Sequence, residues 1–450
     1  MQNKIMEYLK DKKIAILGFG MEGKSTYNFI RRYSDMPLTI IDKNDIYETN
    51  REMLADDNNI SYVIGNDYLK NLSEFDLVIK SPGVITKDID TSNISFSSQL
   101  ELLLKFNREN IIGITGTKGK STTTTLIYEV LRANGIDARL LGNIGKPLLD
   151  DIETYTKDTK LVIEMAALQL EFVTFSPHIG IILNLYEDHL DHSGTIEKYH
   201  QNKLNILKYQ TEKDYMIYHS DIEPLNSYID DSYKGREYRS QLHNKDITLH
   251  TAYIYKDLVY FNQKELFDIN TELHLIGEHN LRNIMIVLIV SEILELDLKT
   301  TIDTIKNFKP LEHRIELVGT YGEIIYYNDS IATIPDATIS AIKALKEVDT
   351  LIFGGLDRGI DYKNFIDFLN TGIVRNLICM PTTGHKIASK IKNKDTNLYN
   401  VDTLEEAIER ARKITTKGKI CLLSPAAASY EYFKNFEEKG KAYKNLVKNL

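Results

Sequence analysis

The fold class of this 450-residue chain is decided by the stretch Ile111-Ile-Gly-Ile-Thr-Gly-Thr-Lys-Gly-Lys-Ser-Thr122. Residues 111–115 are an apolar run typical of a buried strand, and residues 116–122 are a loop rich in glycine and lysine. A loop of this kind, placed between a strand and a helix, presents backbone amides and a helix N-terminus to a phosphate group. The stretch therefore predicts a nucleotide site at the end of a parallel strand.

Three side chains of this loop fit phosphate chemistry. We expect Lys120 to reach the β- and γ-phosphates, and the hydroxyl of Ser121 or Thr122 to reach Mg²⁺. The strict phosphate-loop pattern has glycine where this chain has Ile114. A solvated, lysine-rich turn is the alternative interpretation.

Short apolar runs recur on both sides of this loop, and helical stretches separate them. They cover residues 13–17, 38–41, 77–79, 161–163, 179–183, 324–327, 351–353 and 420–423. This alternation predicts an α/β fold with parallel sheets. The pattern restarts twice, so we expect domains at 1–108, 109–309 and 310–450.

Composition excludes several classes of protein. The net charge is −9, and charges of both signs are interspersed, which argues against a nucleic-acid or anionic-membrane partner. The two cysteines, Cys379 and Cys421, have neither metal nor disulfide spacing. No apolar stretch approaches the ~20 residues that span a bilayer, and the N-terminus has no leader pattern. We expect a soluble cytoplasmic protein without membrane insertion.

A second glycine motif, Gly18-Phe-Gly-Met-Glu-Gly23, follows the run at 13–17, and Asp42 ends the next run. Together they form the dinucleotide-binding fingerprint. Taken alone, the motif fits NAD, another nucleotide, or only close packing between a strand and a helix.

Candidate metal ligands gather between residues 143 and 203. They are Asn143, Glu164, Asp188, His189 and Lys203. Glu164 follows a predicted strand, and strand ends in a parallel sheet place such side chains beside the phosphate loop. Mg²⁺ takes oxygen ligands and keeps several waters there. A lone histidine is more often a surface or capping residue.

The order of these motifs resembles that of the Mur ligases over essentially the whole chain. The matching stretches are 116–122, Gly142-Asn-Ile-Gly145, Glu164-Met-Ala-Ala-Leu-Gln-Leu-Glu171, Asn184-Leu-Tyr-Glu-Asp-His189, Gly277-Glu-His-Asn280, His313-Arg314 and Asn328-Asp-Ser330. Within the family, the chain resembles the D-glutamate-adding branch in four stretches. They are Ser81-Pro-Gly83, Gly354-Gly-Leu-Asp-Arg-Gly359, Leu422-Leu-Ser-Pro-Ala-Ala-Ala-Ser429 and Phe433-Lys-Asn-Phe-Glu437.

The resemblance implies a Rossmann-like UDP-binding domain, a central phosphate-loop ATPase domain and a Rossmann-like C-terminal domain. It assigns the glycine motif at residues 18–23 to UDP rather than NAD. The implied reaction uses ATP and Mg²⁺, with two metal sites, to join glutamate to UDP-N-acetylmuramoyl-L-alanine (UDP-MurNAc-L-Ala) through an acyl phosphate. The family's role is peptidoglycan precursor synthesis, and we expect a monomer.

The resemblance also implies the site residues. The UDP substrate is expected at Gly18, Phe19, Gly20, Glu22, Gly23, Asp42, Ser81, Pro82, Gly83 and Asn143. ATP is expected at Gly116, Thr117, Lys118, Gly119, Lys120, Ser121, Thr122, Asn280, Asn283, Arg314 and Asp329. Metal is expected at Ser121, Thr122, Glu164, His189 and Lys203, and the amino acid at Thr333, Arg358, Ser429, Tyr430 and Phe436. The catalytic set is Lys120, Lys203, His189, Arg314 and Asp329.

Lys203 matches a lysine that these ligases carbamylate. Addition of CO₂ converts an ammonium, which repels Mg²⁺, into an anionic oxygen ligand. Without the resemblance, a lysine on a helix surface would be the interpretation.

The chain departs from its relatives at three places. Ile331 stands where many D-glutamate-adding members have lysine, Arg358 stands where some have lysine, and Ala166-Ala167 replaces a serine pair. The first two leave the choice of amino acid open.

Several other functions remain as alternatives. They are ligation of L-glutamate or another amino acid by a different Mur-type ligase, a folylpolyglutamate synthase, an NAD-binding oxidoreductase and a non-catalytic nucleotide sensor. An oxidoreductase would leave the loop at 116–122 without a role.

Overall fold

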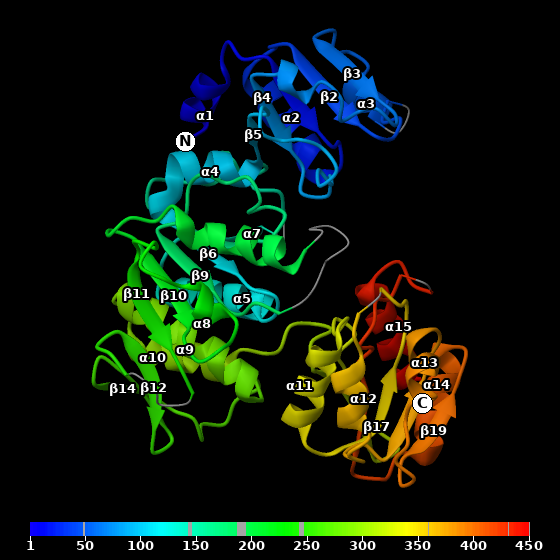
Figure 1. Ribbon diagram of the computed structural model, residues 1–450. Helices are drawn as coiled ribbons and strands as arrows, with labels where there is room; N and C mark the ends of the chain where they lie inside the picture. The colour runs from blue at the N-terminus through cyan, green and yellow to red at the C-terminus, as the bar shows by residue number, and fades with distance from the viewer. Residues whose placement is uncertain are drawn as a thin grey trace. The chain divides into compact units, whose positions relative to one another are not determined.

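The computed structural model describes residues 1–47, 50–142, 146–186, 195–242, 247–358, 360–430 and 432–449. Its internal contacts separate two compact units. The first comprises Met1–Thr271 with Arg282–Ile305, and the second comprises Glu272–Leu281 with Lys306–Leu450. Helices and parallel strands alternate in both units (Figure 1), so the predicted α/β class is confirmed. The division into three domains stays a prediction.

The first sheet lies in the first unit, and its described strands are all parallel in the order β3-β2-β1-β4-β5. They are β1 (Ile14–Leu17), β2 (Leu38–Asp42), β3 (Ile60–Ile64), β4 (Leu77–Lys80) and β5 (Phe96–Ser97). Its helices are α1 (Gln2–Leu9), α2 (Met21–Tyr33), α3 (Arg51–Leu54) and α4 (Gln99–Asn107). Because β1 lies between β2 and β4, the loops that follow these three strands meet at one edge.

The second sheet, also in the first unit, has the order β14-β13-β12-β11-β10-β9-β6-β8-β7. Its strands are β6 (Ile111–Thr115), β7 (Ala138–Gly142), β8 (Lys160–Glu164), β9 (Ile179–Ile182), β10 (Tyr215–His219), β11 (Arg236–Ser240), β12 (Thr251–Tyr255), β13 (Leu258–Phe261) and β14 (Lys264–Asp268). The helices along this part of the chain are α5 (Lys120–Ala133), α7 (Ile196–Lys208), α8 (Leu225–Tyr228), α9 (Glu278–Ile293) and α10 (Leu298–Asn307). The strand before the phosphate loop, β6, is buried throughout and pairs in parallel with β8 and β9.

Strands β12 to β14 are antiparallel because two-residue turns connect them. The residues of the first turn, Lys256 and Asp257, both have positive φ, as do Asn262 and Gln263 in the second. Two consecutive residues of positive φ give the backbone twist that fits a tight hairpin.

The third sheet forms the second unit, with the order β15-β16-β20-β17-β18-β19. Its strands are β15 (Glu316–Tyr321), β16 (Ile324–Asn328), β17 (Val348–Phe353), β18 (Asn376–Cys379), β19 (Asn397–Asn400) and β20 (Ile420–Leu423). Its helices are α11 (Pro335–Leu345), α12 (Lys363–Leu369), α13 (Thr383–Ala388), α14 (Leu404–Ile414) and α15 (Phe436–Lys448).

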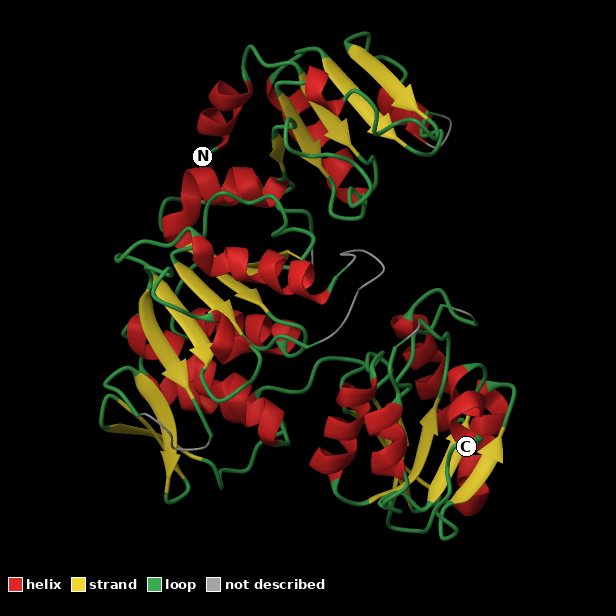
Figure 2. Cartoon of the chain, in the orientation of Figure 1, coloured by secondary structure: helices red, strands yellow, loops and turns green. Residues whose placement is uncertain are grey.

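Helices cover both faces of this third sheet (Figure 2). On one face, Leu351 and Phe353 of β17 pack in a cluster with α11, α12 and α13. On the other face, Ile352 packs in a cluster with α14 and α15. Successive side chains of a strand point to opposite faces, so a strand covered on both sides is apolar without interruption.

The short apolar runs predicted as strands are all strands, with ends that differ by at most a few residues. The strands missing from the prediction include β3 and β19, which lie at sheet edges and are mostly exposed. Within the described parts of the chain, no helix combines the length and the apolar character needed to cross a membrane.

Candidate active site

The phosphate loop connects β6 to α5 by a backbone path that requires glycine. Gly119 caps α5 with a φ of +87°, and a Cβ there would lie 2.8 Å from Asn283 Oδ1. A larger residue would therefore be strained and would push Asn283 away from the loop. The amine of Lys120 folds back over the loop and donates to the carbonyls of Gly116 (2.9 Å) and Thr117 (3.1 Å).

Asn184 fixes the loop from the adjacent strand end. Its Oδ1 accepts hydrogen bonds from the amides of Thr117 (3.0 Å) and Lys118 (2.8 Å), and its Nδ2 donates to the Lys118 carbonyl (2.9 Å). The prediction did not assign a role to Asn184. Its place just after the apolar run 179–183 could have indicated one, since β9 pairs directly with β6.

The predicted metal ligands that the structure describes lie around this loop. Thr122 is buried, and its Oγ1 has no hydrogen-bond partner among the described residues. Glu164 is the last residue of β8 and is also buried. A buried hydroxyl and a buried carboxylate beside a phosphate loop fit Mg²⁺, which prefers oxygen ligands. His189, Asp188 and Asn143 lie outside the described residues.

Lys203 lies on α7 and is only 1% exposed. Its Nζ donates to the carbonyl of Gly116 (2.8 Å) and lies 4.6 Å from the centre of the Tyr199 ring. The Thr195 side chain caps α7 by accepting a hydrogen bond from the Lys198 amide. The structure therefore places this lysine at the phosphate loop, where the sequence predicts it.

The glycine motif at residues 18–23 forms a second loop, between β1 and α2. Gly18 has a φ of +86°, and its carbonyl accepts a hydrogen bond from Ser81 Oγ (2.9 Å). The amide of Phe19 donates to Asp42 Oδ2 (2.8 Å), while the Phe19 side chain is buried. A Cβ at Gly23 would overlap the Gly18 carbonyl, so α2 starts close to the loop. The ends of β1, β2 and β4 thus meet at this loop.

Both loops line one cleft of about 990 Å³ in the first unit. From the predicted UDP set it is lined by Gly18, Gly20, Glu22, Asp42, Ser81, Pro82 and Gly83. From the predicted ATP and metal set it is lined by Thr117, Lys120 and Lys203. A single cleft can therefore hold a nucleotide-linked substrate at one loop and a nucleotide triphosphate at the other.

A buried glutamine connects the two sides of this cleft. Gln169 Nε2 donates to Glu22 Oε1 (3.1 Å), and Gln169 Oε1 accepts from the amide of Ala166 (3.0 Å). Burial raises the pKa of Glu22, although Gln169 and the charge of Lys80 oppose the shift. Gln169 and Lys80 were not predicted as site residues, and their types alone gave no signal.

In the second unit, Asp329 follows β16 and is buried. Its Oδ2 accepts from Ser424 Oγ (2.8 Å), and its Oδ1 accepts from the amide of Ile315 (3.2 Å). Arg314 precedes Ile315, and its charge adds to burial in lowering the pKa of His279 to about 4. Arg314 and Asp329 therefore lie at neighbouring positions in this unit.

Two residues of the predicted ATP site, Asn280 and Asn283, lie about one turn apart on α9. Asn280 Nδ2 donates to the Ile276 carbonyl (2.9 Å), and Asn283 lies beside Gly119. Both side chains are buried.

Three of the predicted amino-acid-site residues come together in the second unit. Arg358 Nη2 approaches the carbonyl of Thr333 (3.5 Å). A bridge between Leu356 and Ala428 brings the Arg358 loop beside Ser429, whose buried Oγ lacks a partner among the described residues.

The other two amino-acid-site predictions lie differently. Tyr430 is 66% exposed, and the Phe436 ring makes an edge contact with His313 at 6.1 Å. A role for either in binding the amino acid stays a prediction.

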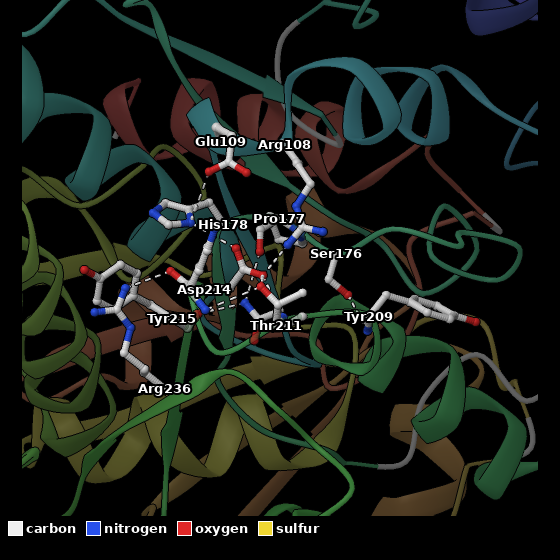
Figure 3. A network of polar contacts seen from close by, with 12 residues as sticks. Arg108, Glu109, Ser176, Pro177, His178, Tyr209, Thr211, Asp214, Tyr215 and Arg236 are labelled. Carbon is white, nitrogen blue, oxygen red and sulfur yellow. Dashed lines mark hydrogen bonds and ion pairs between the residues drawn. The ribbon is translucent and has the colours of Figure 1, made fainter.

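Among the described residues, one group of three side chains has the spacing of a metal site. It consists of Glu109, His178 and Asp214 (Figure 3). The Asp214 carboxylate already accepts hydrogen bonds from Arg108 and from the amide (2.7 Å) and hydroxyl (2.9 Å) of Thr211, and His178 Nδ1 lies 3.0 Å from it.

The pKa of Asp214 is lowered: burial acts to raise it, but the Thr211, His178 and Arg108 hydrogen bonds prevail. These donors already occupy the acceptor sites of the Asp214 carboxylate, so few of its lone pairs are left to bind a metal. The network instead ties residues 108–109 to the starts of β9 and β10.

Two protein-family domains match this chain. The Mur ligase middle domain matches residues 114–291, and the Mur ligase glutamate ligase domain matches residues 313–427. A UDP-N-acetylmuramoylalanine--D-glutamate ligase from Clostridioides difficile (strain 630) is 35% identical, covering 98% of this chain and 99% of that protein. The ligase of the same name from Clostridium tetani (strain Massachusetts / E88) is 31% identical, covering 100% and 99%.

Solved structures share the fold at lower identity. The UDP-N-acetylmuramate-alanine ligase MurC from Thermotoga maritima is 18% identical with a TM-score of 0.57, covering 97% of this chain and 99% of that one. The MurF ligase from Thermotoga maritima, in complex with ADP, is 17% identical with a TM-score of 0.60, covering 99% and 97%. With both of its matched domains and its full-length relatives in agreement, this chain belongs to the Mur ligase family.

Proposed function

We propose that this protein is an ATP-dependent ligase that joins D-glutamate to UDP-MurNAc-L-Ala in cytoplasmic peptidoglycan precursor synthesis. The observation that carries the proposal is the cleft lined by both glycine loops. One loop has the form that binds a diphosphate and the other the form that binds a triphosphate, and this reaction needs both. The full-length relatives bear the name of this activity.

The reaction joins a carboxylate to an amine, and ATP supplies the activation. The alanine carboxylate attacks the γ-phosphorus and ADP leaves, which gives an acyl phosphate. The glutamate amine then attacks the acyl carbon, and phosphate leaves as the amide forms and the amine loses a proton. Phosphoryl transfer of this kind depends mainly on positioning and charge neutralisation.

The residues of this chain have separate roles in that scheme. Lys120, whose amine now caps the loop carbonyls, offsets charge on the transferring phosphoryl group. Arg314 and Asp329 have the roles in ATP binding and catalysis that the family resemblance gives them. Ser121, Thr122, Glu164 and His189 would hold Mg²⁺. Bound metal would supply charge neutralisation at the phosphate oxygens and a common anchor for the two reactants.

Lys203 carries a carbamate in the active enzyme. Its neutral amine adds to CO₂ with loss of one proton, and the product is an anionic oxygen ligand. Two observations support this step: the amine is buried, and it lies at the phosphate loop, 2.8 Å from the Gly116 carbonyl. An unmodified ammonium there would repel Mg²⁺ and would be costly to bury.

The remaining predictions belong to the same proposal. The chain has three functional domains, 1–108, 109–309 and 310–450, and acts as a cytoplasmic monomer. The UDP, ATP and amino-acid residues have the roles that the family resemblance gives them, Asn143 included. Thr333, Arg358 and Ser429 contact the glutamate, where Arg358 supplies a planar fork for a carboxylate.

The proposal is tested by phosphate release with UDP-MurNAc-L-Ala, ATP and a panel of D- and L-amino acids. D-Glutamate should give the highest kcat/KM, with no release when either acceptor or amino acid is omitted. Preference for L-glutamate or for a different amino acid would assign the chain to another ligation. Release that is independent of both substrates would contradict a ligase altogether.

A further inference from the structure

A second buried lysine, Lys439, lies on the second turn of α15 and is 2% exposed. Among the described residues its Nζ makes one hydrogen bond, to the carbonyl of Gly354 (3.0 Å). Burial lowers the pKa of Lys439 to about 8. A methionine or leucine would fill similar space without desolvating an amine, so packing alone does not explain this lysine.

Gly354 is the first residue of the loop that carries Arg358. It has a φ of +125°, and a Cβ there would overlap the Met380 carbonyl. Its amide donates to the carbonyl of Pro425 (2.9 Å), and the amide of Leu356 donates to that of Ala428 (2.9 Å). The Lys439 hydrogen bond therefore holds the first residue of the loop that leads from β17 to Arg358, beside Ser429.

The next residue of α15, Gly440, fixes the other side of this contact. A Cβ at Gly440 would overlap both His313 Nδ1 and Ser330 Oγ, so the helix packs directly against the turn after β16. The helix register is fixed by a cap in which the Glu438 amide donates to Asn435 Oδ1 (2.9 Å). The Lys439–Gly440 pair thus lies between the turn that contains Asp329 and the loop that contains Arg358.

Another lysine on the same helix shows the ordinary arrangement. Lys444 Nζ pairs with Glu312 Oε1 and Glu316 Oε1, each at 2.9 Å. The described partner of the Lys439 amine is a backbone carbonyl, whereas the Lys444 amine pairs with two carboxylates. Its amine therefore serves a directional contact rather than an ion pair.

We propose that Lys439 is a positioning residue for the amino-acid substrate, because it holds the Gly354 carbonyl and thereby sets the loop that presents Arg358. This inference rests on the function proposed above. It predicts a selective effect: loss of the amine disturbs amino-acid binding and leaves the cleft of the first unit intact.

The test uses the full-length enzyme with Lys439→Met, Lys439→Arg and the control Lys441→Met. Lys441 lies on the same helix and is exposed, so the control makes the same chemical change without the buried contact. KM for the amino acid, ATP and UDP-MurNAc-L-Ala is measured together with kcat and Tm. The amino acid is whichever one the wild-type enzyme uses best, so failure of the D-glutamate assignment does not obscure this result.

Lys439→Met should raise the amino-acid KM by about tenfold and change the other two KM values by less than about twofold. Lys439→Arg, which keeps donors and charge, should recover part of the loss, and Lys441→Met should match the wild type. An unchanged amino-acid KM in folded Lys439→Met would overturn the proposal. Equal losses for all three substrates, with a lowered Tm, would also overturn it and assign a structural role.

If Lys439→Met does not fold, Lys439→Arg decides. A selective rise of about threefold or more in the amino-acid KM supports the positioning role. Wild-type values for all three substrates contradict it, because the larger planar head cannot hold the carbonyl in the same geometry.

Discussion

Two buried lysines, one in each unit, make the same contact in different surroundings. Lys203 on α7 donates to the carbonyl of Gly116, which follows β6, and Lys439 on α15 donates to the carbonyl of Gly354, which follows β17. Both glycines begin a loop at the end of a parallel strand. Lys203 also lines the cleft of about 990 Å³, whereas the one hydrogen bond described for Lys439 joins α15 to the loop that follows β17.

The difference shows that burial and a shared hydrogen bond do not by themselves define a role. A lysine that lines the cleft is placed where it could reach a ligand or accept CO₂, as the proposed function requires of Lys203. A lysine enclosed by its own unit can act only through the loop it holds. The following predictions, from the largest expected effect to the smallest, test this distinction.

Lys120→Ala should reduce turnover by at least about a hundredfold, because a preorganised cation at the phosphate loop typically contributes ~3 kcal/mol or more. Lys120 and Lys203 share the Gly116 carbonyl as an acceptor, so this variant removes the cation that reaches the phosphates and leaves the Lys203 bond in place. The measurement is phosphate release, with Tm as the control for folding. A variant that keeps more than half of the wild-type rate would contradict the assignment of the loop.

Lys203→Ala should also be nearly inactive, by about a hundredfold, and acetate or formate should restore part of its activity. A short carboxylate can replace the missing carbamate only where the cleft admits it. The same salts should leave Lys439→Met unchanged, because Lys439 is only 2% exposed and its amine binds a backbone carbonyl. A well-ordered, unmodified Lys203 in a crystal with bound metal and nucleotide would count against the carbamate.

The free energy of unfolding should depend on pH through the titration of Lys439. Burial lowers its pKa to about 8, whereas lysine in an unfolded chain titrates at about 10.4. Between these values the unfolded chain holds the proton and the folded chain does not, so stability rises with pH. Below pH 8 both states are protonated, and the full cost of burying the ammonium is present.

Lys439→Met lacks this group. The wild-type free energy of unfolding, minus that of the variant, should therefore increase by roughly 2 to 3 kcal/mol from about pH 7 to about pH 10. Chemical denaturation at a series of pH values measures this difference. A difference that stays flat with pH would mean that Lys439 is not desolvated as described.

Arg358→Ala should raise the KM for glutamate by about tenfold, or ~1.4 kcal/mol, with smaller effects on ATP and UDP-MurNAc-L-Ala. Ile331 has no charge to offer a carboxylate, so under the proposed function we expect Arg358 to have the larger share of carboxylate binding. Arg358→Lys should recover part of the loss, because the ammonium keeps the charge without the planar fork. An unchanged glutamate dependence would make Arg358 a solvated loop residue and leave specificity open.

Much of the fold could be predicted because central strands are buried on both faces. β6 and β20 are apolar without interruption, and this pattern is visible in the sequence. β19 and β3 are edge strands with exposed side chains, and they are held mainly by backbone pairing. Residues 397–400 of β19 (Asn-Leu-Tyr-Asn) are half polar and carry no comparable signal, whereas residues 60–64 of β3 (Ile-Ser-Tyr-Val-Ile) are strand-forming types that the prediction missed.

The same contrast holds within the candidate site. The glycine loops are local features, so residue type and spacing indicated Gly18, Gly116 and Lys120. The Gln169–Glu22 bond joins residues 147 apart in sequence, and the Lys439–Gly354 bond joins residues 85 apart. Such contacts depend on how strands and helices pack, and the residue types glutamine and lysine do not predict them.

The central claim is the ligation itself, and mass spectrometry of the product tests it most directly. The enzyme is incubated with ATP, Mg²⁺, UDP-MurNAc-L-Ala and either D- or L-glutamate. With D-glutamate, we expect a product whose mass equals that of UDP-MurNAc-L-Ala plus glutamate minus one water, formed together with one ADP and one phosphate. ATP consumption without this product, or the same product formed faster from L-glutamate, would contradict it.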